Sequence, residues 1–366
     1  MGKKGKKQRH QSRTFSFRDS DGELELSTEK SAIQCDESSE SDPEDDSTAK
    51  TEKHTETTAK TPSIFSLYQQ SVQSPKGDIT YLLKFFLMYV GGRLPLHLQE
   101  DFCGTALLSA EWLRSDSRRT AVGLDLDIES LNWCLENNMN IAGSDGYSRI
   151  TLFHGNVLQP TEAKAVKNIP NSCLPSRDII CAFNYSCCCL HKRGDLLHYF
   201  KHVYTGISNK GGIFVMDLYG GTSSERKLKL KREFPDFTVS ILTSFKLQCE
   251  CVCTQYVWEQ DEFDIVQRRS RIRLHFHLRK EKKKLRNAFS YSWRLWSLPE
   301  IRDCLDEVGF DSVHFWLREM PDSLSSKTIQ GFGLGKEIKY EEVTLFNQVD
   351  SWNAYVVAVA NKGFSH

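Results

Sequence analysis

The stretch Glu100-Asp101-Phe102-Cys103-Gly104-Thr105-Ala106 follows a short apolar segment at 94–98 and precedes a helical pattern over 106–114. Gly104 lets the backbone approach a ligand closely, and the small residues beside it let a helix begin at once. A strand, a glycine turn and a helix in this order predict a ligand-binding turn in an α/β domain.

Outward from this turn, short apolar strands alternate with helical patterns. Further strands are expected at 120–124, 150–154, 178–183 and 213–217, with helices at 128–139 and 194–207. After a helix at 299–308 come two more strands, 312–317 and 353–360. This order predicts an α/β fold with a doubly wound, mostly parallel, seven-stranded sheet.

Residues 222–297 interrupt the alternation, because they read as longer amphipathic strands without helices between them. We expect an inserted antiparallel β layer before the C-terminal strands. Within it, apolar residues alternate with basic ones, and the two sets are Ile272, Leu274, Phe276 and Leu278 against Arg271, Arg273, His275, His277 and Arg279. One face should pack on the domain, and the other should carry a cationic row. Segment 268–286 is therefore a candidate contact for RNA or an acidic protein, or else a solvated edge.

The first 62 residues are expected to be a disordered charged tail, and 63–366 the folded domain. Residues 1–18 hold seven basic and no acidic side chains, whereas 19–46 hold twelve acidic ones, with few large apolar residues throughout. The basic cluster is either a nuclear address or a solvated tail. No apolar run approaches the ~20 residues of a membrane span, so we expect no membrane contact and a cytoplasmic or nuclear location.

Twelve cysteines raise the question of a metal site. Cys187, Cys188 and Cys189 are adjacent, and Cys249, Cys251 and Cys253 alternate, but neither group shows the paired spacing of a zinc site. We expect buried thiols and no metal.

The ends of the predicted strands carry the residues best placed for binding. Asp125 lies 21 residues after Gly104, the spacing at which an acid accepts hydrogen bonds from a ribose. The third strand ends at Asn156-Val157, which suits an adenine edge. The fourth ends at Asn184-Tyr185-Ser186, where a group would be transferred.

With these residues the chain resembles the class I, Rossmann-like S-adenosylmethionine-dependent methyltransferases, whose first motif commonly reads acid-x-Gly-Cys-Gly-Thr-Gly. Phe102 and Ala106 replace the first and third glycines, and the side chain of Phe102 is expected to point away from the cofactor. The stretch 67–75 with Glu-Asp-Phe-Cys-Gly-Thr resembles a poorly characterised subgroup with no implied substrate. The resemblance implies that S-adenosylmethionine is bound by Glu100, Cys103, Gly104, Thr105, Asp125, Leu126, Asn156, Val157 and Asn184. From their places at predicted strand ends, Asn184, Tyr185 and Asp217 are candidate catalytic residues that would orient the acceptor or take its proton. Tyr68, Ser186 and Tyr219 are candidate acceptor contacts.

Two other functions stay open. A catalytically silent methyltransferase-like module would bind RNA or protein through 222–297, and Phe102 in the glycine turn keeps this alternative. A nucleotide-binding oxidoreductase is less favoured, because the Gly-x-Gly-x-x-Gly pattern is absent and only Gly104 occupies the turn.

Overall fold

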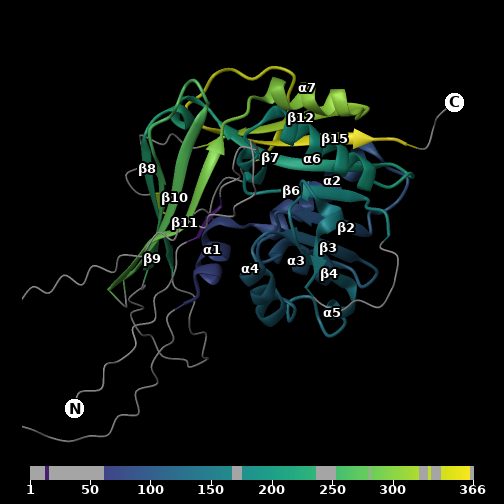
Figure 1. Ribbon diagram of the computed structural model, residues 1–366, viewed down its shortest axis with the longest axis horizontal. Coiled ribbons are helices and arrows are strands. Elements are labelled where there is room, and N and C mark those ends of the chain that lie inside the picture. The colour runs from purple at the N-terminus through teal and green to yellow at the C-terminus, as the bar shows by residue number, and fades with distance from the viewer. Residues whose placement is uncertain are drawn as a thin grey trace, which may run out of the picture.

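The computed structural model describes residues 13–15, 62–166, 175–235, 253–279, 282–320, 329–330 and 339–362. Two sheets dominate this part of the chain, a mostly parallel one and a separate antiparallel one, as the sequence predicts. Figure 1 shows the antiparallel sheet standing beside the helix-covered parallel sheet, with α1 (Ile64–Val72) between them.

The larger sheet has the strand order β14-β12-β15-β7-β6-β2-β3-β4-β5. Five of its strands are parallel neighbours: β2 (His97–Asp101), β3 (Thr120–Asp125), β4 (Ile150–His154), β6 (Ile179–Ala182) and β7 (Gly212–Gly220). The expected C-terminal pair, β12 (Ser312–Glu319) and β15 (Trp352–Ala360), is antiparallel, and β15 also pairs with β7. The sheet has nine strands rather than seven because two-residue strands, β5 (Lys164–Ala165) and β14 (Glu341–Glu342), extend its edges.

Helices cover both faces of this sheet, which makes it doubly wound. Ile213 and Val215 of β7 share a core with α2 (Pro75–Tyr89) and α3 (Leu107–Ser115), whereas Phe214 and Met216 share one with α6 (Arg193–Gly206) and α7 (Leu298–Val308). Successive side chains of a strand point to opposite faces, so a strand covered on both sides is apolar throughout. The remaining helical segments are α4 (Ile128–Trp133), α5 (Gly146–Arg149), η1 (Cys134–Asn138), η2 (Pro160–Glu162), η3 (Ser186–Cys189) and η4 (Thr222–Glu225).

The first strand lies three residues later than predicted, at His97–Asp101 instead of 94–98. Its start is fixed by the Asp178 carboxylate, which accepts hydrogen bonds from the amides of Leu96 and His97 at 2.7 and 3.0 Å. Glu100 and Asp101 therefore lie inside a buried strand rather than after it. A reading based on apolar runs misses this, because it assigns charged residues to loops.

The helix predicted over 128–139 changes type halfway. It is α-helical to Trp133 and continues as the π-helix η1. The wider turn brings Asn138 into the interior, where its side-chain amide donates to the Thr105 carbonyl at 2.7 Å. The π-helix thus supports the glycine turn, a common setting for such segments near functional sites.

The insertion forms an antiparallel sheet of β8 (Leu228–Pro235), β9 (Cys253–Gln260), β10 (Arg269–Leu278) and β11 (Lys283–Arg294). Two short strands, β1 (Arg13–Phe15) and β13 (Ile329–Gln330), add to its edges. The predicted apolar face is confirmed, since Ile272, Leu274, Phe276 and Leu278 are all buried in the core shared with the domain.

The opposite face of β10 carries less net positive charge than its basic residues alone indicate, because nearby acids pair with two of them. Arg273 forms ion pairs with Glu259 and Asp261, and Arg279 pairs with Glu233. His275 is buried, and burial lowers its pKa to about 4, so it is neutral at pH 7. Arg271 stays exposed. Contact of 268–286 with RNA or an acidic protein stays a prediction.

Cys187, Cys188 and Cys189 are buried free thiols, as expected. The predicted alternation of Cys249, Cys251 and Cys253 falls largely outside the described residues. Of the charged tail, only β1 and Pro62 lie within them. In the described part of the chain, no helix is long and apolar enough to cross a bilayer.

Candidate active site

The glycine turn after β2 is tied to the end of β3. The amide of Gly104 donates to Asp125 Oδ2 at 2.6 Å, and the amide of Cys103 donates to the Leu124 carbonyl at 3.1 Å. The other carboxylate oxygen of Asp125 accepts from the amide of Asp127 at 2.8 Å. The Leu126 amide also stabilises the charged carboxylate, and because a carboxylate has about four acceptor sites it can still accept a hydrogen bond from a ligand.

Three residues of this turn, Phe102, Gly104 and Ala106, have left-handed φ values of 55, 51 and 47°. Such values suit glycine and cost a residue with a Cβ about 1–2 kcal/mol. A Cβ on Gly104 would meet nothing within 4 Å, because the backbone there faces open space. The turn is therefore held in a strained shape that exposes backbone to a cavity.

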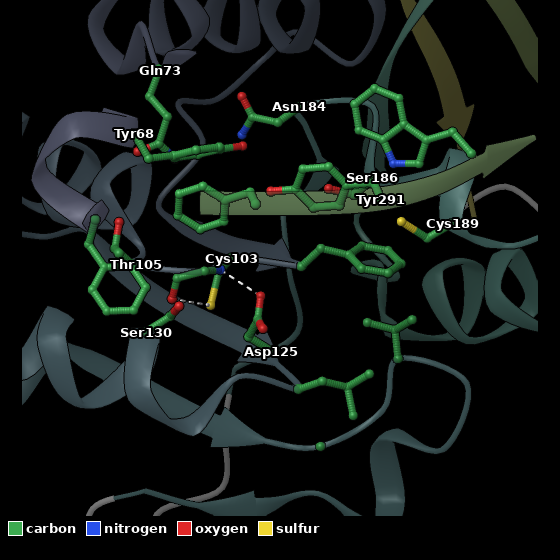
Figure 2. A pocket seen from close by; sticks show the side chains of 18 residues that line it. Tyr68, Gln73, Cys103, Thr105, Asp125, Ser130, Asn184, Ser186, Cys189 and Tyr291 are labelled. Carbon is green, nitrogen blue, oxygen red and sulfur yellow. Dashed lines mark hydrogen bonds between the residues drawn. The ribbon is translucent and has the colours of Figure 1, made fainter. Parts of the chain in front are cut away.

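A first cavity lies at the carboxyl ends of β2, β3 and β4 (Figure 2). Asp125 and Ser130 lie on one side of it, and Tyr68, Gln73 and Asn184 on the opposite side. The predicted residues Cys103, Gly104, Thr105, Leu126, Val157 and Ser186 also line it. The structure thus gathers most of the predicted cofactor residues around one space.

Two features of the first cavity call for a polar ligand. Burial raises the pKa of Asp125 to about 6, against hydrogen bonds from the amides of Asp127 and Gly104 that lower it. A ligand that donates a hydrogen bond to this carboxylate would therefore stabilise its charged form, because the bond replaces lost hydration. On the facing wall, Gln73 Oε1 is buried and accepts no hydrogen bond within the described residues. A buried acceptor without a partner costs about 1–3 kcal/mol, which a ligand donor would recover.

The rest of the first cavity is largely aromatic. Phe65 and Tyr68 come from α1, Phe102 from the glycine turn, and Phe289, Tyr291 and Trp293 from β11. Phe102 is among the lining residues, and its ring meets that of the buried Tyr199 edge-on at 5.7 Å, so its direction relative to a cofactor stays a prediction. Aromatic faces favour apolar and positively charged ligand groups.

The turn after β6 lies between the first cavity and a second cavity. Asn184 and Tyr185 both have φ of 59°, and Asp217 of β7 accepts their amides at 3.0 and 2.7 Å. Two left-handed residues in a row are held in place by one carboxylate. Burial raises the pKa of Asp217 to about 8, and the Asp78 carboxyl adds to this rise.

The second cavity shares four wall residues with the first: Tyr68, Asn184, Tyr291 and Trp293. Its volume is about 310 Å³, many times the roughly 10–15 Å³ that one water needs, so it has room for a small molecule. The side chain of Asn184 has no hydrogen-bond partner in the described residues, and it lies where the two cavities meet. Two ligands, one in each cavity, would therefore meet at the side-chain amide of Asn184.

No protein-family model matches the chain, and no curated protein matches it either. The similar solved structures include an S-adenosylmethionine-dependent methyltransferase from Clostridium acetobutylicum, 15% identical, covering 80% of this chain and 96% of that one, with a TM-score of 0.47. The sugar N-methyltransferase KedS8 from Streptoalloteichus is 10% identical, covers 86% and 99%, and has a TM-score of 0.48. The CcbJ methyltransferase from Streptomyces caelestis is 12% identical, covers 80% and 95%, and has a TM-score of 0.47. These structural neighbours are methyltransferases.

Three predicted site residues line neither cavity. Glu100 is buried in β2, where its carboxylate accepts from the Ser109 amide and hydroxyl at 3.0 and 2.6 Å. Asn156 accepts from the Leu158 amide at 2.9 Å, so its backbone neighbours Gly155 and Val157 reach the first cavity instead. Tyr219 packs against Tyr185, with ring centroids 4.8 Å apart, and lies behind the second cavity.

Several wall residues were missed by the sequence reasoning. The aromatic set of β11 could have been found, because Phe289, Tyr291 and Trp293 alternate and must share one face of a strand. Asp78 and Arg318 carried no such signal, since they come from α2 and β12, far apart in sequence, and meet only in the fold.

Proposed function

We propose that residues 63–366 form an S-adenosylmethionine-dependent methyltransferase that binds the cofactor in the first cavity. The proposal rests chiefly on the Gly104–Asp125 pair, which sets a bare glycine backbone and a carboxylate at the carboxyl edge of the sheet, facing one cavity and next to another. Nucleotide-like ligands of doubly wound sheets bind at this edge.

The residues present fit the chemistry of S-adenosylmethionine. Asp125 would accept the ribose hydroxyls, and Leu126, Gly155 and Val157 would lie against the adenine. Gln73 Oε1, which lacks a partner within the described residues, would accept from a donor of the cofactor such as its amino group. The aromatic rings of the first cavity would face the positively charged sulfur.

S-adenosylmethionine supplies a methyl group on a sulfonium, and transfer needs the acceptor held in line with the carbon–sulfur bond. Asn184 would orient the acceptor, since its amide lies where the cavities meet. Asp217 holds the strained Asn184–Tyr185 backbone and lines the second cavity, where it would accept a proton. Ser186 and Tyr68 would contact the acceptor from the shared end of the first cavity.

The predicted residues outside the cavities would act through their neighbours. Glu100 anchors α3 through Ser109, and Asn156 shapes the bend that brings Gly155 and Val157 to the first cavity. Tyr219 supports the ring of Tyr185. We therefore propose these three as positioning residues.

Calorimetric titration of the whole protein with S-adenosylmethionine, S-adenosylhomocysteine and NAD tests the proposal. We expect both sulfur compounds to bind with one site per chain and NAD not to bind. Binding of NAD alone would favour an oxidoreductase. No binding of any of the three would favour the silent module, with Phe102 filling the space that a glycine leaves free.

A further inference from the structure

The second cavity has walls that fit one kind of small molecule, and this inference rests on the proposed methyltransferase activity. Its walls are rich in tyrosine and tryptophan from both sheets and from the segments beside them: Tyr185, Tyr256, Trp258, Tyr291, Tyr340 and Tyr355. Rings with polar tips favour a compact organic body and attract a cation to their faces.

Two carboxyl groups line this aromatic cavity. Asp78, in the first turn of α2, accepts from the Tyr355 hydroxyl at 2.5 Å, and Asp217 accepts the two amides described above. Burial raises the pKa of Asp78 to about 6, against the Tyr355 hydrogen bond and the Arg318 charge that lower it, and the Asp78 carboxyl disfavours ionisation of Asp217. A ligand ammonium between them would offset both the burial and the repulsion.

One cation lines the same cavity on a third element. The Arg318 guanidinium, from β12, lies 4.6 Å from the centroid of the Tyr340 ring, and its buried Nε has no hydrogen-bond partner among the described residues. Among the residues that the structure describes, no carboxylate lies within 4 Å of this guanidinium, although its charge lowers the pKa of Asp78 in the same cavity. A half-buried guanidinium in this state is an anchor for a ligand anion.

The sheet register relates the strands that carry Arg318 and Asp217. Arg318 is opposite Asn353 on β15, which is opposite Tyr219 on β7, two residues beyond Asp217. Residues opposite one another, or two apart along a strand, share a face, so Arg318 and Asp217 lie on the same face of the sheet. With β15 between them, their strands are about 10 Å apart, a span that a small molecule bridges.

We infer that the second cavity takes a small amine that also carries an anionic group, with the amine at Asp217 and Asp78 and the anion at Arg318. The amine is the methyl acceptor. Asp217 takes a proton from the ammonium, and the nitrogen lone pair forms a bond to the donor methyl carbon. The carbon–sulfur bond breaks with its electron pair left on sulfur, giving S-adenosylhomocysteine.

Matched sets of three compounds test this assignment. Each set holds an amino acid, the amine lacking its carboxylate and the acid lacking its amine: for example tyrosine, tyramine and 3-(4-hydroxyphenyl)propionate. Further sets use histidine, tryptophan and 4-aminobutyrate, and aminoalkyl phosphates replace the carboxylate by phosphate. The full-length protein is assayed with S-adenosylmethionine labelled in its methyl group, and cofactor binding is measured separately by calorimetry.

We expect at least one set in which the compound with both charges is methylated with a kcat/KM about tenfold or more above that of the amine alone. The compound without the amine should bind without being methylated. Preference for the carboxylate or the phosphate member identifies the anion. Arg318→Gln should remove the tenfold preference and leave cofactor affinity unchanged, whereas Arg302→Gln, an exposed arginine stacked over Phe315 outside both cavities, should change neither.

The failures are distinguishable. If S-adenosylmethionine does not bind, the proposed function fails. If it binds but no compound with both charges is preferred, or label enters only RNA or protein, the assignment of the second cavity is overturned while the cofactor site stands. Equal methylation of amines with and without the anion by the wild type also overturns it.

Discussion

The Gly104 amide donates to Asp125 Oδ2 at 2.6 Å, which ties the turn after one strand of the sheet to the end of its neighbour. The carboxylate therefore has two tasks, since it shapes the turn and faces the first cavity. A substitution at Asp125 should therefore affect both ligand binding and the stability of the turn. Affinity measurements show the first effect, and thermal unfolding shows the second.

We expect Asp125→Ala to weaken S-adenosylmethionine binding by roughly ten- to a hundredfold, because hydrogen bonds to charged groups contribute about 1.5–3 kcal/mol. Calorimetry gives the affinity, and thermal unfolding shows whether the domain remains folded. Asp303→Ala, at an exposed position of α7, is the matched control. Unchanged affinity in a folded Asp125 variant would remove this carboxylate from the cofactor site.

Asn184→Ala should lower kcat by roughly ten- to a hundredfold with little change in cofactor affinity, because small losses of acceptor alignment are costly in a transfer reaction. The measurement is methyl transfer to the best acceptor of the matched sets, beside a cofactor titration. Asn137→Ala, on the exposed side of η1, should leave both unchanged. A variant at Asn184 with full kcat would mean that the acceptor is oriented elsewhere.

The buried Glu100 predicts how stability depends on pH. Burial raises its pKa from 4.5 to about 7, so between these values the folded state holds a proton that the unfolded state has lost. Stability from this group is therefore greatest below about pH 4.5 and falls as the pH rises to 7. Glu100→Gln keeps an oxygen for the Ser109 amide and hydroxyl and does not titrate.

Melting temperatures from about pH 5 to 8 at constant ionic strength test this expectation. The melting temperature of the wild type should fall more steeply with pH than that of Glu100→Gln, and exposed Glu162→Gln should follow the wild type. Parallel curves for wild type and Glu100→Gln would show that Glu100 does not hold its proton in the folded state.

We propose that 268–286, on the outer face of β10, binds RNA or an acidic protein. The binding should be weak, because ion pairs within the protein already neutralise part of the positive charge. Arg273 and Arg279 are paired to acids, and Arg271 is exposed and has no ion pair among the described residues. We expect an oligouridine probe to bind at low salt with a slope of log K against log salt of about −1, which Arg271→Glu abolishes. Fluorescence anisotropy over a salt series measures it, and absence of binding at low salt would leave this face as a solvated surface.

The parts of the fold that follow local patterns were predictable. β3, β4 and the antiparallel pair β12–β15 lie within one or two residues of their expected places, because apolar runs bounded by polar residues indicate buried strands. β2 was misplaced because its last residues are two buried acids, held by Ser109, Gln99 and Tyr199. Apart from Gln99, the partners of these acids lie outside the strand, so no local sequence pattern indicates that the acids are buried.

The candidate site also has a part that local sequence predicts and a part that only the assembled fold creates. Gly104 and Asp125 follow from spacing along the chain, whereas the second cavity depends on Asp78, Asp217 and Arg318, which come from three separate elements. Strand register places Arg318 on the face of Asp217, and register is a property of the assembled sheet. The proposed cofactor class was therefore within reach of the sequence, and the proposed acceptor class was not.

Tyr68 of α1 is part of the wall of both cavities and packs on Phe289 at 4.9 Å, so its ring cannot shift for one ligand without altering the surroundings of the other. Occupancy of the two cavities is then thermodynamically linked. By reciprocity, whatever factor the donor imposes on acceptor affinity, the acceptor imposes on donor affinity. A nine-residue helix would thus couple donor and acceptor binding in the proposed methyltransferase.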